Sequence, residues 1–111
     1  MKRYTVVVEP GAEDDLNGIV EYIASHDSVD RAVDVASRIE RSFGTLETLP
    51  NRGAYPKELL DYGSRDYREI YFKPYRIIYR VLDDDALVII VLIADGRRDM
   101  QTLLTSRVLG A

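Results

Sequence analysis

The sequence predicts an α+β fold, in which a helical hairpin precedes a meander of antiparallel strands. Two observations lead to this prediction. Apolar residues recur at helical spacing through the first half of the chain, and the second half holds β-branched and aromatic runs separated by short turns. Blocks of helices and strands that are separated along the chain are typical of α+β folds. The expected order is β-α-α-β-β-β-α, within one domain spanning residues 1–111.

The first half is expected to form a strand and two helices. Residues 4–8 are β-branched and aromatic and are followed by turn residues, which predicts a strand. An amphipathic helix begins near Ala12, with acidic residues in its first turn, where the helix dipole favours them. Asp27 or Ser28 can cap a second helix. The apolar stripe of this second helix consists of Ala32, Val35, Ala36, Ile39, Phe43 and Leu46.

The second half is expected to form three strands and a terminal helix. Residues 51–63 show no clear period after a Pro- and Gly-containing helix end, so they are expected to be a loop. Strands are predicted at about 66–72, 75–82 and 86–94, and a short helix at 99–109. Short turns make these strands antiparallel neighbours. The hairpin is expected to cover one face of the mostly antiparallel sheet and to leave the other face for function.

The charge is distributed unevenly. Fifteen basic and 19 acidic residues give a net charge of −4, which argues against a general nucleic-acid binder. Residues 9–49 carry ten acidic and three basic side chains, whereas residues 65–80 carry five basic and two acidic ones. The second segment is therefore either a local basic patch or an ordinary solvated face.

Several kinds of site are not expected. The chain has no cysteine and one histidine, His26, so neither a metal site nor a Ser-His-Asp arrangement is expected. It has no glycine-rich phosphate motif, so no cofactor is expected. The nine-residue apolar run at 86–94 is about half of the roughly 20 residues that cross a bilayer, and the start resembles no secretory signal. We therefore expect a cytoplasmic protein without membrane contact.

The segment 65–80 interleaves tyrosine with arginine and lysine. Strand alternation places Arg76 and Arg80 on one face among aliphatic residues. Cross-strand pairing with Asp66 or Glu69 accounts for them structurally, with about 0.2–1 kcal/mol per pair. The same mixture suits contact with a macromolecule, because Tyr and Arg are enriched at binding hot spots. Both interpretations stay open at this point.

Five short motifs follow one another in a fixed order. They are Ala12 to Leu16 at the first helix start, Tyr22-Ile23-Ala24, Leu49-Pro50-x-x-Gly53, Tyr75-Arg76-Ile77-Ile78-Tyr79 and Gly96-Arg97-Arg98-Asp99. Together with the opening strand, they resemble the RelE/ParE superfamily, the toxins of bacterial toxin-antitoxin modules, also described as plasmid stabilisation proteins. The resemblance covers nearly the whole chain.

The resemblance implies one of two activities. RelE-like members cut messenger RNA on the ribosome, and ParE-like members poison DNA gyrase. RelE-like cleavage uses basic side chains to neutralise the phosphate, together with an acid/base near the terminal helix. Arg76 and Arg98 match the arginines of that set and are the catalytic candidates under the nuclease alternative. The expected lysine pair instead falls near Arg68 and Ile70, and the terminal tyrosine near Leu104.

The ending at residues 96–99 and the strand at 75–79 look more like ParE. The resemblance therefore favours gyrase inhibition, without catalytic residues or a cofactor in this chain. The expected target-binding residues are Arg97, Arg98, Arg76 and Arg80. An inert module that keeps only antitoxin binding is a third alternative.

The resemblance also implies a cognate antitoxin and a toxin-antitoxin hetero-oligomer. A helical hairpin over a sheet leaves an apolar groove for the partner's amphipathic helix, and an acidic hairpin favours basic residues on that partner. The expected groove residues are Leu16, Ile19, Val20, Ile23, Val35, Ile39 and Phe43. Each of them can serve the domain's own core instead, so both roles stay open.

Overall fold

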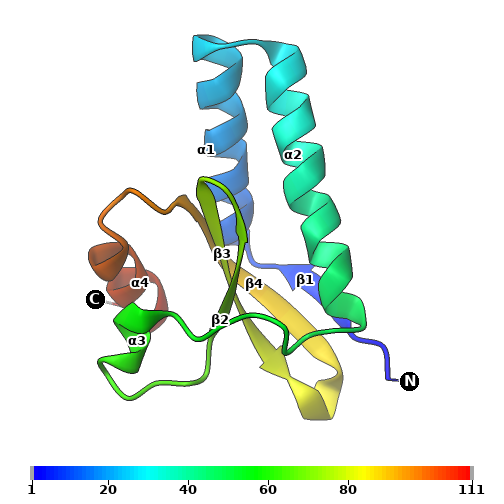
Figure 1. The fold of residues 1–111 in the computed structure, drawn as a ribbon, viewed down its shortest axis with the longest axis vertical. Coiled ribbons are helices and arrows are strands. Elements are labelled where there is room, and N and C mark those ends of the chain that lie inside the picture. The colour runs from blue at the N-terminus through cyan, green and yellow to red at the C-terminus, as the bar shows by residue number, and fades with distance from the viewer. Residues whose placement is uncertain (1, 111) are drawn as a thin grey trace.

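The computed structural model describes residues 2–110 and contains a four-stranded mixed sheet with helices on both faces (Figure 1). The predicted fold class and order of elements are confirmed, with one additional helix. The elements are β1 (Thr5–Val8), α1 (Pro10–His26), α2 (Val29–Gly44), α3 (Lys57–Leu60), β2 (Arg68–Phe72), β3 (Tyr75–Leu82), β4 (Leu87–Asp95) and α4 (Met100–Leu109), with 3-10 turns η1 (Thr45–Glu47) and η2 (Asp83–Asp85).

Strand β4 lies inside the sheet, whose order is β1-β4-β3-β2. Strand β1 runs parallel to β4, and the other pairs are antiparallel. Central strands buried on both faces read as continuous apolar runs, which explains why the most apolar segment of the sequence forms β4. Strand β1 pairs only with Leu87–Ile90, so the rest of β4, from Val91 to Asp95, has no strand neighbour on that side.

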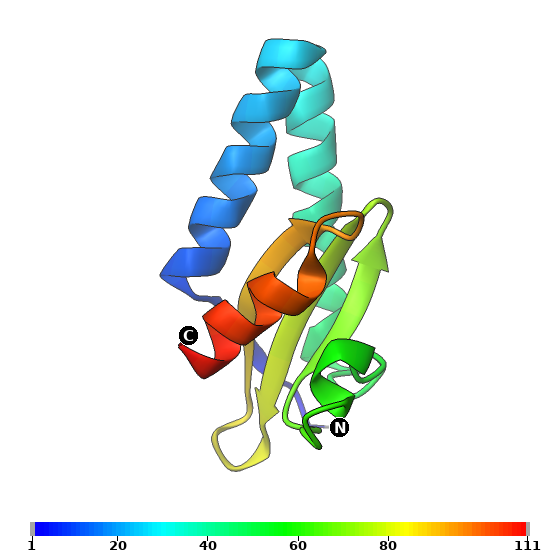
Figure 2. The same ribbon diagram turned by 90° about the vertical axis from the view of Figure 1, so that its left-hand side faces the viewer.

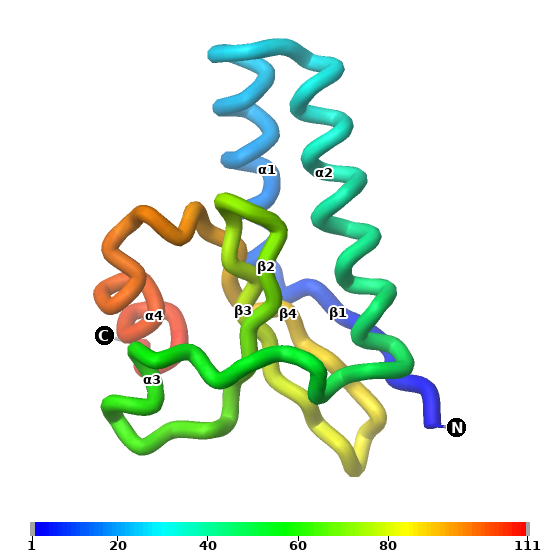
Figure 3. Tube along the Cα trace, viewed as in Figure 1, coloured from blue at the N-terminus to red at the C-terminus, as the bar shows by residue number. Residues whose placement is uncertain are grey.

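Helices α1 and α2 form the expected hairpin. Pro10 occupies the first turn of α1, where a missing N–H costs no hydrogen bond, so the helix begins earlier than the apolar pattern indicated. Ser28 caps α2, because its Oγ accepts a hydrogen bond of 3.0 Å from the backbone N–H of Arg31. The two helices lie side by side and reach beyond the sheet (Figure 3). No helix within residues 2–110 is long and apolar enough to cross a membrane.

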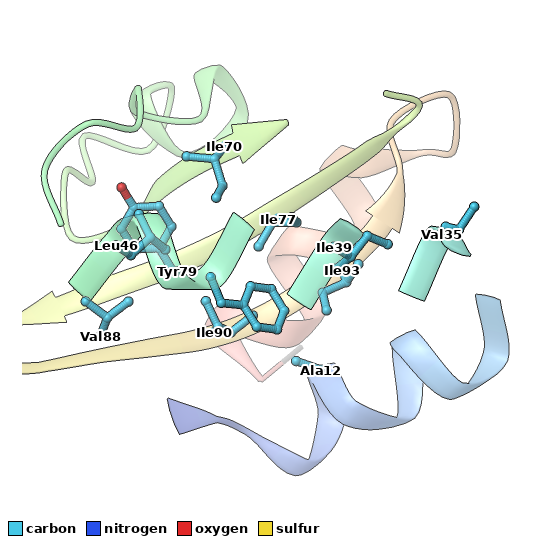
Figure 4. Close-up of a cluster of buried hydrophobic side chains, with 11 residues drawn as sticks. Ala12, Val35, Ile39, Leu46, Ile70, Ile77, Tyr79, Val88, Ile90 and Ile93 are labelled. Carbon is cyan, nitrogen blue, oxygen red and sulfur yellow. The ribbon is translucent and has the colours of Figure 1, made fainter. Parts of the chain in front are cut away.

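The hairpin covers one sheet face, and the side chains between them form the larger core cluster (Figure 4). Its buried members are Ala12, Val35, Ile39, Phe43, Leu46, Ile70, Ile77, Tyr79, Val88, Ile90 and Ile93. Tyr79 is fully buried, and its hydroxyl donates to the Pro50 carbonyl at 2.7 Å and accepts from the Gly53 N–H at 3.0 Å. A Cβ on Gly53 would lie 2.6 Å from that hydroxyl. The Leu49-Pro50-x-x-Gly53 motif therefore leaves space for the Tyr79 hydroxyl and binds it through the Pro50 carbonyl and the Gly53 N–H.

Helices α3 and α4 cover the opposite face, as Figure 2 shows. The buried residues between them and the sheet are Leu59, Ile78, Val91, Leu92, Ala94, Met100 and Leu104. Two expectations are therefore wrong. Residues 51–63 contain the four-residue α3, which is too short to show a period, and the second face is partly covered rather than left open.

Arg107 of α4 closes the uncovered edge of β4. Its Nη1 and Nη2 donate to the Asp15 carboxylate at 2.9 and 3.0 Å, and Nη1 also donates to the Val91 carbonyl at 2.8 Å. Asp15 in turn accepts from the backbone N–H of Ile93 at 3.0 Å. Unpaired edge groups invite other strands, and this ion pair satisfies one carbonyl and one N–H of the edge while it joins α1, β4 and α4.

Candidate functional site

Arg76 of β3 is buried beneath α3 and is held by two carboxylates. Its Nη1 and Nη2 donate to the two carboxylate oxygens of Glu58, both at 2.8 Å, and its Nε donates to Glu69 Oε1 at 2.7 Å. The exposed fractions of Arg76, Glu58 and Glu69 are 7, 8 and 5%. The cross-strand partner Glu69 agrees with the sequence interpretation, whereas Glu58 was missed with α3.

The cluster of Arg76, Glu58 and Glu69 is a structural network with an excess of negative charge. Two carboxylates surround one guanidinium, which leaves a net charge of −1. The hydrogen bonds from Arg76 lower the pKa of Glu58, and the carboxylates raise the pKa of Arg76. Burial, and then the charge of Glu69, raise the pKa of Tyr71, whose hydroxyl donates to Glu69 at 3.1 Å. Removal of Arg76 from such a network costs about 3–5 kcal/mol, since two buried carboxylates are left without their cation.

Gly96 gives the Arg76 side chain its space. A Cβ on Gly96 would lie 3.0 Å from Cδ and 3.1 Å from Cγ of Arg76. Two of the motifs that the sequence singled out, residues 75–79 and 96–99, are thus in direct contact. The glycine of the second motif accommodates the arginine of the first.

Arg97 and Arg98 lie on the exposed turn between β4 and α4. Arg97 donates to the Asp95 carboxylate through Nε at 2.9 Å and Nη2 at 2.6 Å, and these bonds lower the pKa of Asp95. Arg98 is exposed and forms no ion pair within residues 2–110. Asp99 caps α4 by accepting from the N–H and hydroxyl of Thr102, which also lower the pKa of Asp99. A well-anchored helix start therefore presents Arg98 to solvent.

The four expected target-binding arginines do not share one surface. Arg76 is buried. Arg80 is half-buried and lies towards the end of β3, whereas Asp95 and the turn that follows it lie at the start of β3, where Tyr75 pairs with Asp95. The Arg80 guanidinium lies 5.8 Å from the centre of the Tyr67 ring. Only Arg97 and Arg98 are brought together at the surface.

The expected antitoxin groove is divided in the same way. Val35, Ile39 and Phe43 are buried in the larger core, while the remaining four side chains are only partly covered. Ile19 and Ile23 line a groove of about 580 Å³ between α1 and the end of β4. The other lining residues are Asp14, Asp15, Gly18, Tyr22, Tyr75, Ile93, Ala94, Asp95, Arg97 and Arg98. This groove therefore adjoins the exposed arginine pair.

A family model described as the ParE toxin of the type II toxin-antitoxin system parDE matches residues 6–100. The chain belongs to the ParE toxin family. No curated protein sequence matches this ParE-family toxin. Among residues 2–110, no group of three or more His, Cys, Asp and Glu side chains could hold a metal ion.

Solved structures that share the fold of this ParE-family toxin include the following three. The chromosomal ParDE system of P. aeruginosa has 16% identity and a TM-score of 0.69, covering 86% of this chain and 98% of that one. The RelBE2 toxin-antitoxin complex of Mycobacterium tuberculosis has 24% identity and a TM-score of 0.57, with coverage of 84% and 98%. The E. coli toxin RelE, as a double arginine-to-alanine variant in the free state, has 13% identity and a TM-score of 0.65, with coverage of 97% and 96%.

Proposed function

We propose that this ParE-family toxin inhibits DNA gyrase rather than cutting messenger RNA. The buried network of Arg76 supports this choice. Catalysis of phosphate cleavage requires donors aimed at the charge that develops in the transition state. The Nε, Nη1 and Nη2 atoms of Arg76 are occupied by Glu58 and Glu69 at distances of 2.6–2.8 Å. A phosphate would have to displace two carboxylates and enter a site of net negative charge.

The contact with gyrase is proposed to involve Arg98 and Arg97 at the start of α4. Arginine is enriched among residues that dominate binding energy, and Arg98 has no partner within residues 2–110 that would compete with a target. Arg76 supports this surface from beneath by packing against Gly96. An action on gyrase and chromosomal DNA would take place in the cytoplasm.

The test is to incubate the purified toxin with gyrase, ATP and supercoiled plasmid and to look for protein-linked linear DNA after denaturation. Accumulation of linear DNA is expected. A parallel reaction with translating ribosomes scores cleavage of messenger RNA in a reading-frame-dependent pattern. Cleaved RNA without linear DNA would reject the gyrase proposal, and growth without arrest on induction would indicate an inert module.

We further propose that a cognate antitoxin neutralises this toxin by laying an amphipathic helix along the groove beside α1. The groove offers Ile19 and Ile23 together with the side chain of Tyr22, which is 64% exposed. Asp14 lines the same groove and favours a basic residue on the partner, whereas Asp15 is already paired with Arg107. The groove also holds Arg97 and Arg98.

This docking site is tested by titrating the cognate antitoxin into Tyr22→Ala and into a matched control, Tyr62→Ala. Tyr62 is 60% exposed and lies outside the groove. We expect Tyr22→Ala to weaken binding about tenfold or more, as hot-spot tyrosines do, and Tyr62→Ala to bind as the wild type does. Equal affinities of all three proteins would remove the groove from the antitoxin interface.

A further inference from the structure

Three arginines converge on a polar hollow near the end of the sheet away from Arg97 and Arg98. Arg65 precedes β2, Arg68 is its first residue, and Arg80 lies on the neighbouring strand β3. The hollow has a volume of about 210 Å³. Within the described chain, none of the three arginines has a carboxylate oxygen within 4.0 Å. Three arginines without a direct ion pair therefore line one small concavity.

Two of these guanidinium groups are held in place. Arg68 donates to the Gly53 carbonyl at 2.9 Å and to the Tyr55 hydroxyl at 3.0 Å, and it lies 4.5 Å from the centre of the Tyr55 ring. Arg80 lies against the Tyr67 ring, and its buried Nε has no hydrogen-bond partner within the described chain. An unsatisfied buried donor costs about 1–3 kcal/mol. The Arg80 Nε is therefore a donor that this fold leaves unused, although the nitrogen itself is closed to solvent.

Two carboxylates also line the hollow and reduce its positive potential. The carboxylate of Asp83 accepts the Tyr4 hydroxyl at 2.6 Å, and Asp66 also lies in the wall. Three guanidinium groups against two carboxylates leave a net charge of +1. The hollow therefore attracts an anion, although less strongly than three isolated arginines would.

We propose that the hollow formed by Arg65, Arg68 and Arg80 binds a phosphate group. Guanidinium N–H groups match the oxygens of phosphate, and cations from three separate chain positions suit a tetrahedral anion better than a planar carboxylate with two oxygens. This proposal is independent of the target of the toxin, because Arg97, Arg98 and the antitoxin groove are not part of the hollow.

The experiment is calorimetric titration of the full chain with inorganic phosphate at low salt. The variants are Arg65→Gln and Arg80→Gln, with Arg41→Gln as a matched control on the exposed surface of α2. Arg65 is exposed, so its replacement is expected to leave the core and the fold unchanged. We expect saturable one-to-one binding of phosphate to the wild type. The affinity should fall about tenfold in each hollow variant, because a charged hydrogen bond is lost, and should stay unchanged in Arg41→Gln. Asp66→Asn is expected to tighten binding.

Two further probes distinguish the sources of the phosphate. Tighter binding of a single-stranded DNA oligonucleotide than of inorganic phosphate, with the same loss in Arg65→Gln, would assign the site to a nucleic-acid backbone. Tighter binding of ATP, with no binding of the oligonucleotide, would assign it to a free nucleotide. The proposal is overturned if none of the three probes saturates, or if Arg41→Gln loses as much affinity as the hollow variants.

Discussion

The two faces of the sheet are stabilised by different chemistry. The hairpin face is a continuous apolar cluster, whereas the opposite face combines an apolar cluster with the network of Arg76, Glu58 and Glu69. An apolar cluster loses stability in proportion to the side-chain atoms removed. A buried ionic network instead loses most when its one cation is removed, because both carboxylates then stay buried without it. The opposite face is therefore the more sensitive to a single polar substitution.

The same contrast separates two arginines that the resemblance assigned together to the target-binding residues. Arg76 is 7% exposed and bound by two carboxylates, while Arg98 is exposed and unpaired within residues 2–110. Arg76 therefore contributes to the stability of the toxin, whereas the Arg98 side chain is free to contact a target. The following substitutions test this difference, in order of decreasing expected effect.

Arg76→Ala is expected to lower the free energy of unfolding by about 3–5 kcal/mol, because Glu58 and Glu69 stay buried without their cation. Arg98→Ala is the control and is expected to change it by less than about 0.5 kcal/mol. Urea denaturation of both variants measures the difference. A wild-type unfolding midpoint for Arg76→Ala would show that the network contributes nothing to stability.

Gly53→Ala tests the anchor of the hairpin face. The added methyl group would lie 2.6 Å from both the Tyr79 hydroxyl and the Glu69 carbonyl, so we expect a loss of about 1–3 kcal/mol from overpacking. Gly18→Ala is the matched control, because nothing lies within 4 Å of its added Cβ in α1. Thermal unfolding should show a gain of about 0.5–1 kcal/mol for Gly18→Ala. Equal effects of the two substitutions would contradict the close approach at Gly53.

The pH dependence of stability should report on Glu58. Its pKa in the folded chain is lowered by Arg76, so its contribution is complete above the unfolded pKa of about 4.5 and is lost as the pH falls through the folded pKa. Urea midpoints of the wild type should therefore decline as the pH falls from about 5 towards 3. Glu58→Gln should show a flatter decline over this range. Parallel curves would mean that Glu58 titrates alike in the folded and unfolded chains.

Features that depend on residues close together in the sequence could be predicted from it. Strand β3 has the predicted bounds, and Ser28, one of the two candidate caps, begins α2. The features that were missed depend on partners that are distant along the chain. Glu58 meets Arg76 across 18 residues from a helix too short for periodicity, and Asp15 meets Arg107 across 92 residues.

Periodicity also identifies an apolar face without revealing what covers it. Val35, Ile39 and Phe43 have the spacing expected of a docking stripe, yet they pack into the larger core. Similarly, the resemblance grouped Arg76 with Arg97 and Arg98 as a target-binding residue. The burial of Arg76 could not be predicted, because burial of a charged side chain depends on which carboxylates the fold brings to it.

The most direct test of this account compares the protein-linked linear DNA that gyrase forms with the wild-type toxin and with Arg98→Ala. Both proteins are used at equal folded concentration, checked by thermal unfolding. The account predicts that Arg98→Ala melts like the wild type and produces much less linear DNA, since it loses a target contact but no internal one. Undiminished linear DNA would remove Arg98 from the surface that acts on gyrase.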